Sequence, residues 1–461
     1  MKTLAKLLFA VALVLPLSVI DAAAQSTKQQ IEDLKQQIDA IQVQNQQQIE
    51  QLKQQIQLLE NARQADQEKI AEMETKQIKE DADAWYKNFI AKYDKGLIFQ
   101  SADGNYKMRF RMRGQFRLTV NDPEEGLVST NFSIPRLRLI WDGHAFKPWF
   151  LYYLQLSPID SNALRDLYFT FAYRTDIAPR VGQWKVPFNR EELNSSGALQ
   201  FVDRSIVNSE FGLGRDRGVA VLGGLGANNN FSYELGIFNG DGRNGTSVDS
   251  NLLYAGRIQF GLGGDDFKFD ANSSYATAKA YQITPNFAKS PTFVIGAAAA
   301  TIPGLDCSRK TPDGGACARV AELGFPQSDF TQITGDVSFK MPWFNIEGEY
   351  DGRWLSPDTG SQDTAYDQGF RVQAGAFLVP KIFEVAGRFA YIDYDTKSGV
   401  VPPGVSVSSS EWAITPGLSY YISHDHRWKI QADYSFVRTE YTLDEPREDD
   451  NIFRLQLQAY F

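Results

Sequence analysis

The sequence predicts an all-β protein, namely a 16-stranded antiparallel transmembrane β-barrel preceded by an N-terminal α-helical coiled coil. Three observations lead to this fold class. An export signal begins the chain, a Gln-rich stretch with apolar residues in steps of three and four follows, and apolar and polar residues then alternate down to Phe461. The composition agrees, because 13% of the 461 residues are aromatic. Only one short apolar run could be mistaken for a membrane helix, which excludes a polytopic helical membrane protein.

Residues 1–24 have the features of a secretory signal peptide. Lys2 and Lys6 precede an apolar run from 7 to 20, and the small residues of 22–24 provide a cleavage site. The run is too short to span a bilayer, so we expect cleavage after Ala24 rather than a retained anchor. Loss of this segment, with its net charge of +1, takes the formal charge from −9 to −10. This acidic balance gives no support to nucleic-acid binding.

Residues 25–82 have the pattern of a coiled coil, which we expect to lie in the periplasm. The apolar seam positions are Ile31, Leu34, Ile38, Ile41, Ile49, Leu52, Ile56 and Leu59. Asn45 takes one seam position, and the pattern then restarts four residues later, which is a stutter. A narrow seam cannot stabilise an isolated helix, so the pattern predicts self-association, with two strands weakly favoured. A solvated spacer helix is the alternative, and residues 83–104 are expected to be a linker.

From residue 105 to 461 the pattern has a period of two, and one face is apolar while the other is charged. In the first segment Met108 and Phe110 share one face, and Arg109 and Arg111 share the other. A soluble sandwich also alternates, but these segments run to ten residues or more, as a tilted membrane crossing requires. The sequence therefore predicts an outer-membrane barrel with its apolar face towards lipid.

Turn signals set the number of strands. Short turns are expected near 145–147, 175–178, 227–230, 263–266, 341–343, 379–381 and 423–426. They alternate with eight longer polar connections, which gives sixteen strands with both ends on one side. The segment 292–302 could be a strand inside the longest connection, 278–327. We assign it to a folded loop, because counting it as a crossing breaks the alternation of turn and loop.

Cys307 and Cys317 lie in this longest connection. Export would bring them into an oxidising compartment, where we expect them to form a disulfide that staples the loop. Such a bond contributes roughly 2–3 kcal/mol. A metal or redox site is the alternative, but no histidine lies near and the spacing is not CxxC.

The lumen of such a barrel is wide enough to hold water, and its lining charges decide which ions pass. The connection 187–216 is long enough to fold inward and narrow it. Basic residues expected on an anion pathway are Lys107, Arg109, Arg111, Arg113, Arg117, Arg136, Arg138, Lys185, Arg190, Arg204, Arg215 and Arg217. Like charges two residues apart repel, which a water-filled pore tolerates. The alternative is internal pairing with carboxylates, for which the candidates are Glu347, Glu349, Asp351 and Glu384.

Catalysis has little support in the sequence. It contains no G-x-S-x-G elbow, no phosphate-cradling GK[ST] loop and no HExxH motif. His424-Asp425-His426 falls in an expected short turn and is interpreted as a solvated turn rather than a metal site. We therefore expect no enzyme activity, no metal and no cofactor.

Several stretches resemble the phosphate-selective porin O and P family. They are 181–188 (VGQWKVPF), 201–205 (FVDRS), 214–218 (GRDRG) and 236–240 (GIFNG), and the resemblance extends over roughly 96–461. It implies a homotrimeric outer-membrane channel with an inward loop and a basic lumen that favours phosphate or polyphosphate. The implied trimer differs from the two strands favoured by the coiled coil, and we give priority to the barrel, where the resemblance covers more of the chain. The alternatives are a weakly selective general porin and a structural anchor for the periplasmic rod.

Overall fold

A computed structural model of the protein describes most of the chain in two compact units, Met1–Lys87 and Asn88–Phe461. The described residues are 20–85, 89–124, 126–226, 230–245, 250–262, 291–308, 315–325, 327–358, 362–397, 399–443 and 445–461. Of the expected signal peptide, residues 1–19 therefore lie outside them.

The first unit contains one long helix, α1 (Ile20–Trp85), of 66 residues. Its sequence has neither Gly nor Pro, which suits an uninterrupted helix. The seam side chains that the structure describes are uncovered in the single chain, since Leu52 is 57%, Ile56 54% and Leu59 69% exposed. In the described part of the chain no helix has an apolar stretch of the length needed to cross a membrane.

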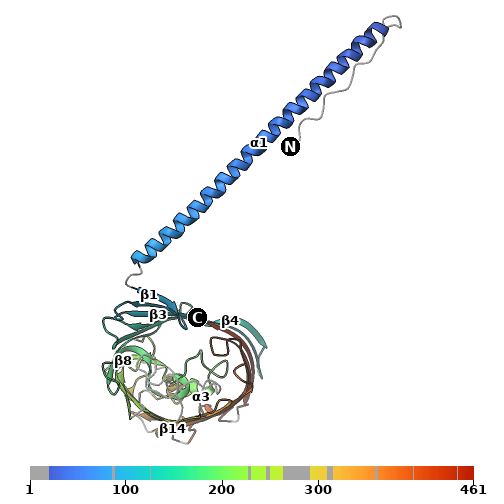
Figure 1. Ribbon diagram of the computed structural model, residues 1–461. Helices are drawn as coiled ribbons and strands as arrows, with labels where there is room; N and C mark the ends of the chain where they lie inside the picture. Colours follow the sequence, from blue (N-terminus) through green and yellow to red (C-terminus); the bar gives the residue numbers. More distant parts are fainter. Residues whose placement is uncertain are drawn as a thin grey trace. The chain divides into compact units, whose positions relative to one another are not determined.

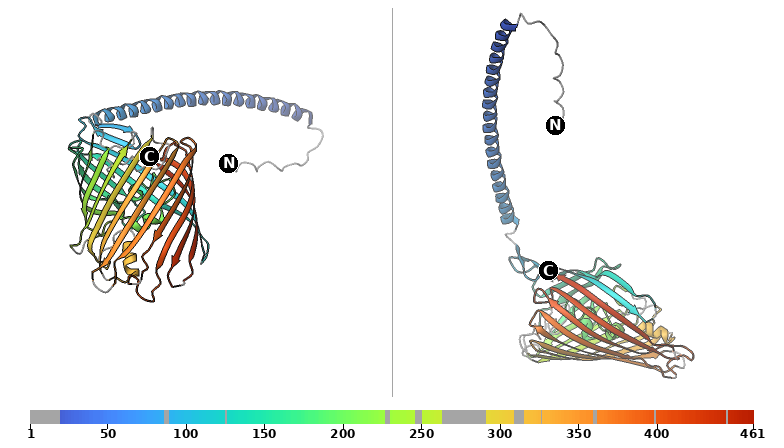
Figure 2. Two further views of the ribbon diagram at one scale, coloured as in Figure 1. Left: turned by 90° about the horizontal axis from the view of Figure 1, so that it is seen from below. Right: turned by 90° about the vertical axis from the view of Figure 1, so that its right-hand side faces the viewer.

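The second unit is a closed barrel of sixteen antiparallel strands with two further strands, which confirms the predicted fold class (Figure 1). The barrel strands are β3 (Lys107–Pro123), β4 (Ser129–His144), β5 (Phe150–Leu156), β6 (Leu164–Phe171), β7 (Ala178–Lys185), β8 (Arg215–Leu225), β9 (Phe231–Phe238), β10 (Leu253–Leu262), β11 (Thr292–Leu305), β12 (Ser328–Lys340), β13 (Phe344–Pro357), β14 (Ala365–Val379), β15 (Phe383–Asp393), β16 (Ser408–Tyr421), β17 (Trp428–Tyr441) and β18 (Glu448–Tyr460). Pairing of β18 with β3 closes the ring. Figure 2 shows the strands running obliquely around it.

The segment 83–104, expected to be a linker, contains a hairpin of β1 (Phe89–Tyr93) and β2 (Leu97–Ser101). Strand β2 pairs with the first residues of β3, with Phe99 opposite Met108. This pairing is possible because β18, the strand that closes the barrel, pairs with β3 only from Arg113 onwards. The start of β3 would otherwise be an unpaired edge, and β2 satisfies its backbone groups.

The assignment of 292–302 to a folded loop is wrong, because Thr292–Leu305 is the barrel strand β11. It pairs with β10 on one side and with β12 on the other. The alternation of apolar and polar residues is weak in this strand, because its faces carry the same small side chain at Ala297, Ala298, Ala299 and Ala300. The count of sixteen is unchanged, since β11 is the crossing that follows β10. The short turn expected near 263–266 lies outside the described residues.

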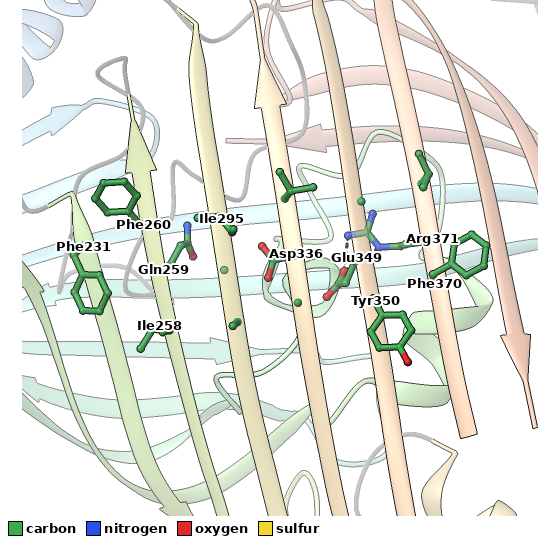
Figure 3. A pocket seen from close by; sticks show the side chains of 16 residues that line it. Phe231, Ile258, Gln259, Phe260, Ile295, Asp336, Glu349, Tyr350, Phe370 and Arg371 are labelled. Atoms are coloured by element: carbon green, nitrogen blue, oxygen red, sulfur yellow. Dashed lines mark hydrogen bonds and ion pairs between the residues drawn. The ribbon is translucent and has the colours of Figure 1, made fainter. Parts of the chain in front are cut away.

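The barrel wall has an apolar outer face and a charged inner face. On β13 and β14, Tyr350 pairs with Phe370 and Glu349 pairs with Arg371. Both aromatic rings are exposed, at 39% and 38%, whereas Arg371 is 1% exposed. Figure 3 shows this wall from close by: aromatic and aliphatic side chains line an apolar hollow, and Arg371 and Glu349 point toward one another.

The described parts of two connections pack against the barrel wall. We call residues 186–214 the inner loop, which carries α2 (Arg190–Leu193) and α3 (Ile206–Phe211), and Figure 1 shows α3 within the ring of strands. We call 306–327 the stapled loop; it carries α4 (Ala316–Glu322), and a disulfide joins Cys307 to Cys317. Both loops contribute to one buried apolar cluster with the wall, whose members include Trp184, Phe188, Leu213, Phe238, Val320 and Leu323.

Candidate functional site

The inner loop is attached to the wall of β12–β15 by buried ion pairs. Arg190 Nε lies 2.7 Å from Glu347 Oε2, and its Nη1 lies 3.5 Å from Asp336 Oδ1. Glu191 pairs with Arg371 at 3.1 Å and with Arg388 at 3.3 Å. These side chains have almost no exposed surface. These ion pairs fix the inner loop to this part of the wall.

Two of the carboxylates expected to pair with the basic side chains of the first strand, those from Lys107 to Arg117, instead take part in this attachment. Glu347 and Glu349 both contact Arg371, at 2.7 Å and 2.6 Å. Glu349 also accepts a hydrogen bond from the backbone N–H of Glu191, at 3.1 Å. They bind the inner loop and their own wall instead of the first strand, because they lie on strand β13.

The basic row on β3 has other carboxylate partners. Arg109 and Arg111 both pair with Asp142, the former at 2.6 Å, and Arg111 also donates a hydrogen bond to the Tyr460 hydroxyl at 2.6 Å. Asp142 lies on the neighbouring strand, directly opposite Arg109. Asp142 is not among the residues predicted from the sequence, although its place opposite the basic side chains of β3 follows from the register of the hairpin.

Further along the lumen, Arg117 and Arg136 share Asp203 of the inner loop, at 2.9 Å and 2.7 Å. Burial alone would raise the pKa of Asp203, but the charges of Arg136 and Arg117 outweigh it and lower the pKa. Asp203 belongs to the motif 201–205, which ends at Ser205. The Ser205 hydroxyl caps α3 by accepting a hydrogen bond from the backbone N–H of Asn208, at 3.2 Å.

Between the inner loop and the wall of β3–β8 lies a polar cavity of about 270 Å³. Its charged lining residues are Arg113, Arg136, Arg138, Arg165, Lys185, Glu192, Arg204 and Arg215. Ser195, Ser196 and Ser209 add hydroxyl groups. Among the described residues the lining thus contains seven cations and one carboxylate. We call it the basic cavity.

Arg113 and Arg138 form the wall side of the basic cavity. They are directly opposite each other on β3 and β4. Arg113 donates hydrogen bonds to the Ser195 and Ser196 hydroxyls, at 3.1 Å and 2.8 Å, and Arg138 donates one to Ser157. Within the described residues no carboxylate lies within 4 Å of the Arg138 guanidinium. Like charges at opposite positions destabilise a sheet, so a passing anion would relieve their repulsion.

Glu192 of α2 lies at the loop side of the basic cavity. Its carboxylate is 3.5 Å from Lys185 Nζ, 3.2 Å from Arg204 Nε and 4.0 Å from Arg215 Nη1. Burial alone would raise the pKa of Glu192, but the charges of Arg204, Lys185 and Arg215 lower it to about 2. The carboxylate is therefore ionised at neutral pH.

Six predicted pathway residues thus meet in the basic cavity: Arg113, Arg136, Arg138, Lys185, Arg204 and Arg215. The other six, Lys107, Arg109, Arg111, Arg117, Arg190 and Arg217, do not line it. Arg217 is exposed on β8, on the same face as Val219, because alternation turns it away from Asp216. Arg190 is buried in the attachment of the inner loop.

Arg165, which was not predicted from the sequence, lines the basic cavity and pairs with Asp160 at 3.3 Å. It lies at the start of the short strand β6, whose sequence contains no series of alternating basic residues. His424 and His426 lie in the turn between β16 and β17. Among the described residues no group of His, Cys, Asp and Glu side chains could hold a metal ion.

One protein family matches part of this chain. Residues 107–290 match the family described as phosphate-selective porin O and P, which confirms the resemblance seen in the sequence. No curated protein matches the chain.

Among solved structures, Salmonella typhi OmpF in complex with daunomycin has a TM-score of 0.51 at 10% identity, covering 81% of this chain and 100% of that chain. The anion-selective porin from Comamonas acidovorans has a TM-score of 0.47 at 12% identity, covering 77% and 100%. The loop L8 deletion mutant of Vibrio cholerae OmpT has a TM-score of 0.48 at 10% identity, covering 77% and 99%. At these identities the OmpF likeness concerns the barrel fold alone.

Proposed function

We propose that this chain, an outer-membrane porin that matches the phosphate-selective porin O and P family over residues 107–290, lets small anions such as phosphate diffuse passively across the outer membrane. The basic cavity carries the proposal. Seven cations and one carboxylate give it a strongly positive lining. A cleft lined by one sign of charge raises the local concentration of the opposite ion, and lining charges set which ions a pore conducts.

The size of the basic cavity favours small solutes. Its volume of about 270 Å³ is below the roughly 300–1,000 Å³ of sites that bind drug-sized ligands. Arginine forks and hydroxyl groups match the oxygen atoms of phosphate and carboxylate groups, and they can replace part of the hydration shell of an anion. The family and fold are those of a channel, and the transport step we propose needs no cofactor.

Single-channel recording in a planar bilayer tests the proposal. Purified protein is inserted between KCl solutions of different concentration, and the reversal potential gives the ratio of anion to cation permeability. We expect conduction with a ratio above one, and inorganic phosphate should reduce the chloride current. A cation-selective channel, or a barrel that does not conduct, would contradict the proposal. A ratio near one would favour a weakly selective general porin.

We also infer that the chain is a homotrimer whose α1 helices associate in the periplasm. The uncovered apolar side chains of α1 support this inference, because Leu52, Ile56 and Leu59 have no cover in the single chain. The variant Leu52→Asp with Ile56→Asp should weaken subunit association in detergent, measured by light scattering on a sizing column. Gln54→Asp, on the same helix, is the matched control. An unchanged mass for the double variant would show that α1 does not contribute to assembly.

A further inference from the structure

Glu192 is an acidic residue in a cavity whose other described charged lining residues are all basic. Among the described lining residues it is the only carboxylate, and it faces Lys185, Arg204 and Arg215 at 3.5 Å, 3.2 Å and 4.0 Å. The amide of Asn208 also lies 3.4 Å from Glu192 Oε2, within hydrogen-bond distance. Two guanidinium groups, one ammonium group and one amide therefore converge on a single carboxylate. This is the set of groups that would bind a free anion of the same kind.

The neighbouring acidic residues of the inner loop make a different kind of contact. Glu191 pairs with Arg371 and Arg388 of the barrel wall, and its side chain is 2% exposed. Glu210 pairs with Arg353 at 2.6 Å and does not line the basic cavity. These two carboxylates attach the inner loop to the wall. The side chain of Glu192, at 11% exposed, instead contacts the groups that an entering anion would meet.

We propose that Glu192 sets the selectivity of the channel, because its carboxylate occupies the place of a bound anion among Lys185, Arg204 and Arg215. The inference rests on the proposed anion conduction. A pore must bind its ion strongly enough for entry and weakly enough for release. With Glu192 ionised, the three cations retain a net attraction for a second anion, but they do not hold it tightly. Without that charge, an anion entering the basic cavity would stay longer.

The test compares the wild type with Glu192→Gln in the full-length protein in planar bilayers at about 0.1 M KCl. Two quantities are measured: the anion-to-cation permeability ratio, from the reversal potential, and the phosphate concentration that halves the chloride current. Glu192→Gln removes one negative charge that lies about 6 Å, through water, from an anion in the basic cavity. This should raise the permeability ratio about fourfold and lower the half-blocking phosphate concentration at least about twofold. Glu210→Gln removes the same charge from the same loop outside the basic cavity, and both quantities should stay within about 1.5-fold of the wild type.

Glu192→Asp separates charge from shape. It keeps the negative charge, so its permeability ratio should stay closer to the wild type than to Glu192→Gln. If Glu192→Gln does not give a folded barrel, judged by its shifted mobility on a gel without heating, Glu192→Ser is the second neutral variant with the same expectation. If the wild type is anion-selective but the neutral variants change neither the permeability ratio nor the half-blocking phosphate concentration, Glu192 does not set the selectivity. The proposed function would still stand in that case. A wild type without anion preference would overturn the proposed function itself.

Discussion

Arg138 should contribute more to anion preference than Arg109, although both belong to the basic rows of the first two strands. Arg138 lines the basic cavity, and no carboxylate of the described residues lies within 4 Å of its guanidinium. Arg109 lies outside the cavity lining, and its guanidinium is 2.6 Å from Asp142. It is four residues from Arg113 on β3, which corresponds to about 13 Å along a strand. The variants Arg138→Gln and Arg109→Gln remove equal charges at these two places.

The expected magnitudes follow from the distance between the removed charge and an ion in the basic cavity. We take this distance as about 6 Å for Arg138 and about 13 Å for Arg109. At about 6 Å in water, one unit charge changes the energy of an ion by about 0.7 kcal/mol, and screening at 0.1 M salt lowers this to about 0.4 kcal/mol. The energies of an anion and a cation move in opposite directions, so Arg138→Gln should lower the permeability ratio about fourfold. At about 13 Å, screening leaves only about 0.1 kcal/mol, so Arg109→Gln should change the ratio by less than about 1.5-fold.

The assay is the reversal potential in a KCl gradient, measured on the same day for the wild type and both variants. Repetition at about 1 M salt should shrink the effect of Arg138→Gln, because the screening length falls to about 3 Å. Equal losses of anion preference in the two variants would refute the assignment of the pathway to the basic cavity. No loss in either variant would show that the arginine rows serve only the internal pairing of the barrel.

Three further predictions concern stability and pH. Arg371→Ala removes the guanidinium that the buried carboxylates of Glu191, Glu347 and Glu349 share, which should cost about 3–5 kcal/mol and lower the temperature of the heat-induced gel shift; an unchanged temperature would show that the inner loop is held elsewhere. Replacing Cys307 and Cys317 together by Ser should cost about 2–3 kcal/mol in the same measurement and leave the reversal potential unchanged, and a changed potential would place the stapled loop on the ion path. Because the pKa of Glu192 is lowered to about 2, its ion pairs are complete above its ordinary pKa and are lost only as the pH falls through about 2. The difference in reversal potential between the wild type and Glu192→Gln should therefore stay constant from pH 7 to pH 4, and a difference that shrinks near pH 5 would contradict this ionisation.

Much of the barrel could be predicted from the sequence, because strand alternation is a local property. The side chains of Met108 and Arg109 must point to opposite faces of a strand whatever the rest of the chain does. The predicted short turns near 145–147 and 341–343 likewise fall between paired strands. The prediction failed where the local signal is weak: the alanine run of β11 has no contrast between its faces, and the hairpin β1–β2 depends on an edge that exists only once β18 has closed on β3.

The sequence by itself determined that basic side chains line the inside of a barrel, but only the tertiary structure decided what each of them does. Arg109 and Arg113 follow the same alternation on one strand, yet one pairs with Asp142 and the other lines the basic cavity. Arg190 and Arg204 lie on one loop, and the first is buried against Glu347 while the second faces the cavity. Coulomb energy depends on distance and burial, and both come from contacts between segments that are far apart in the chain.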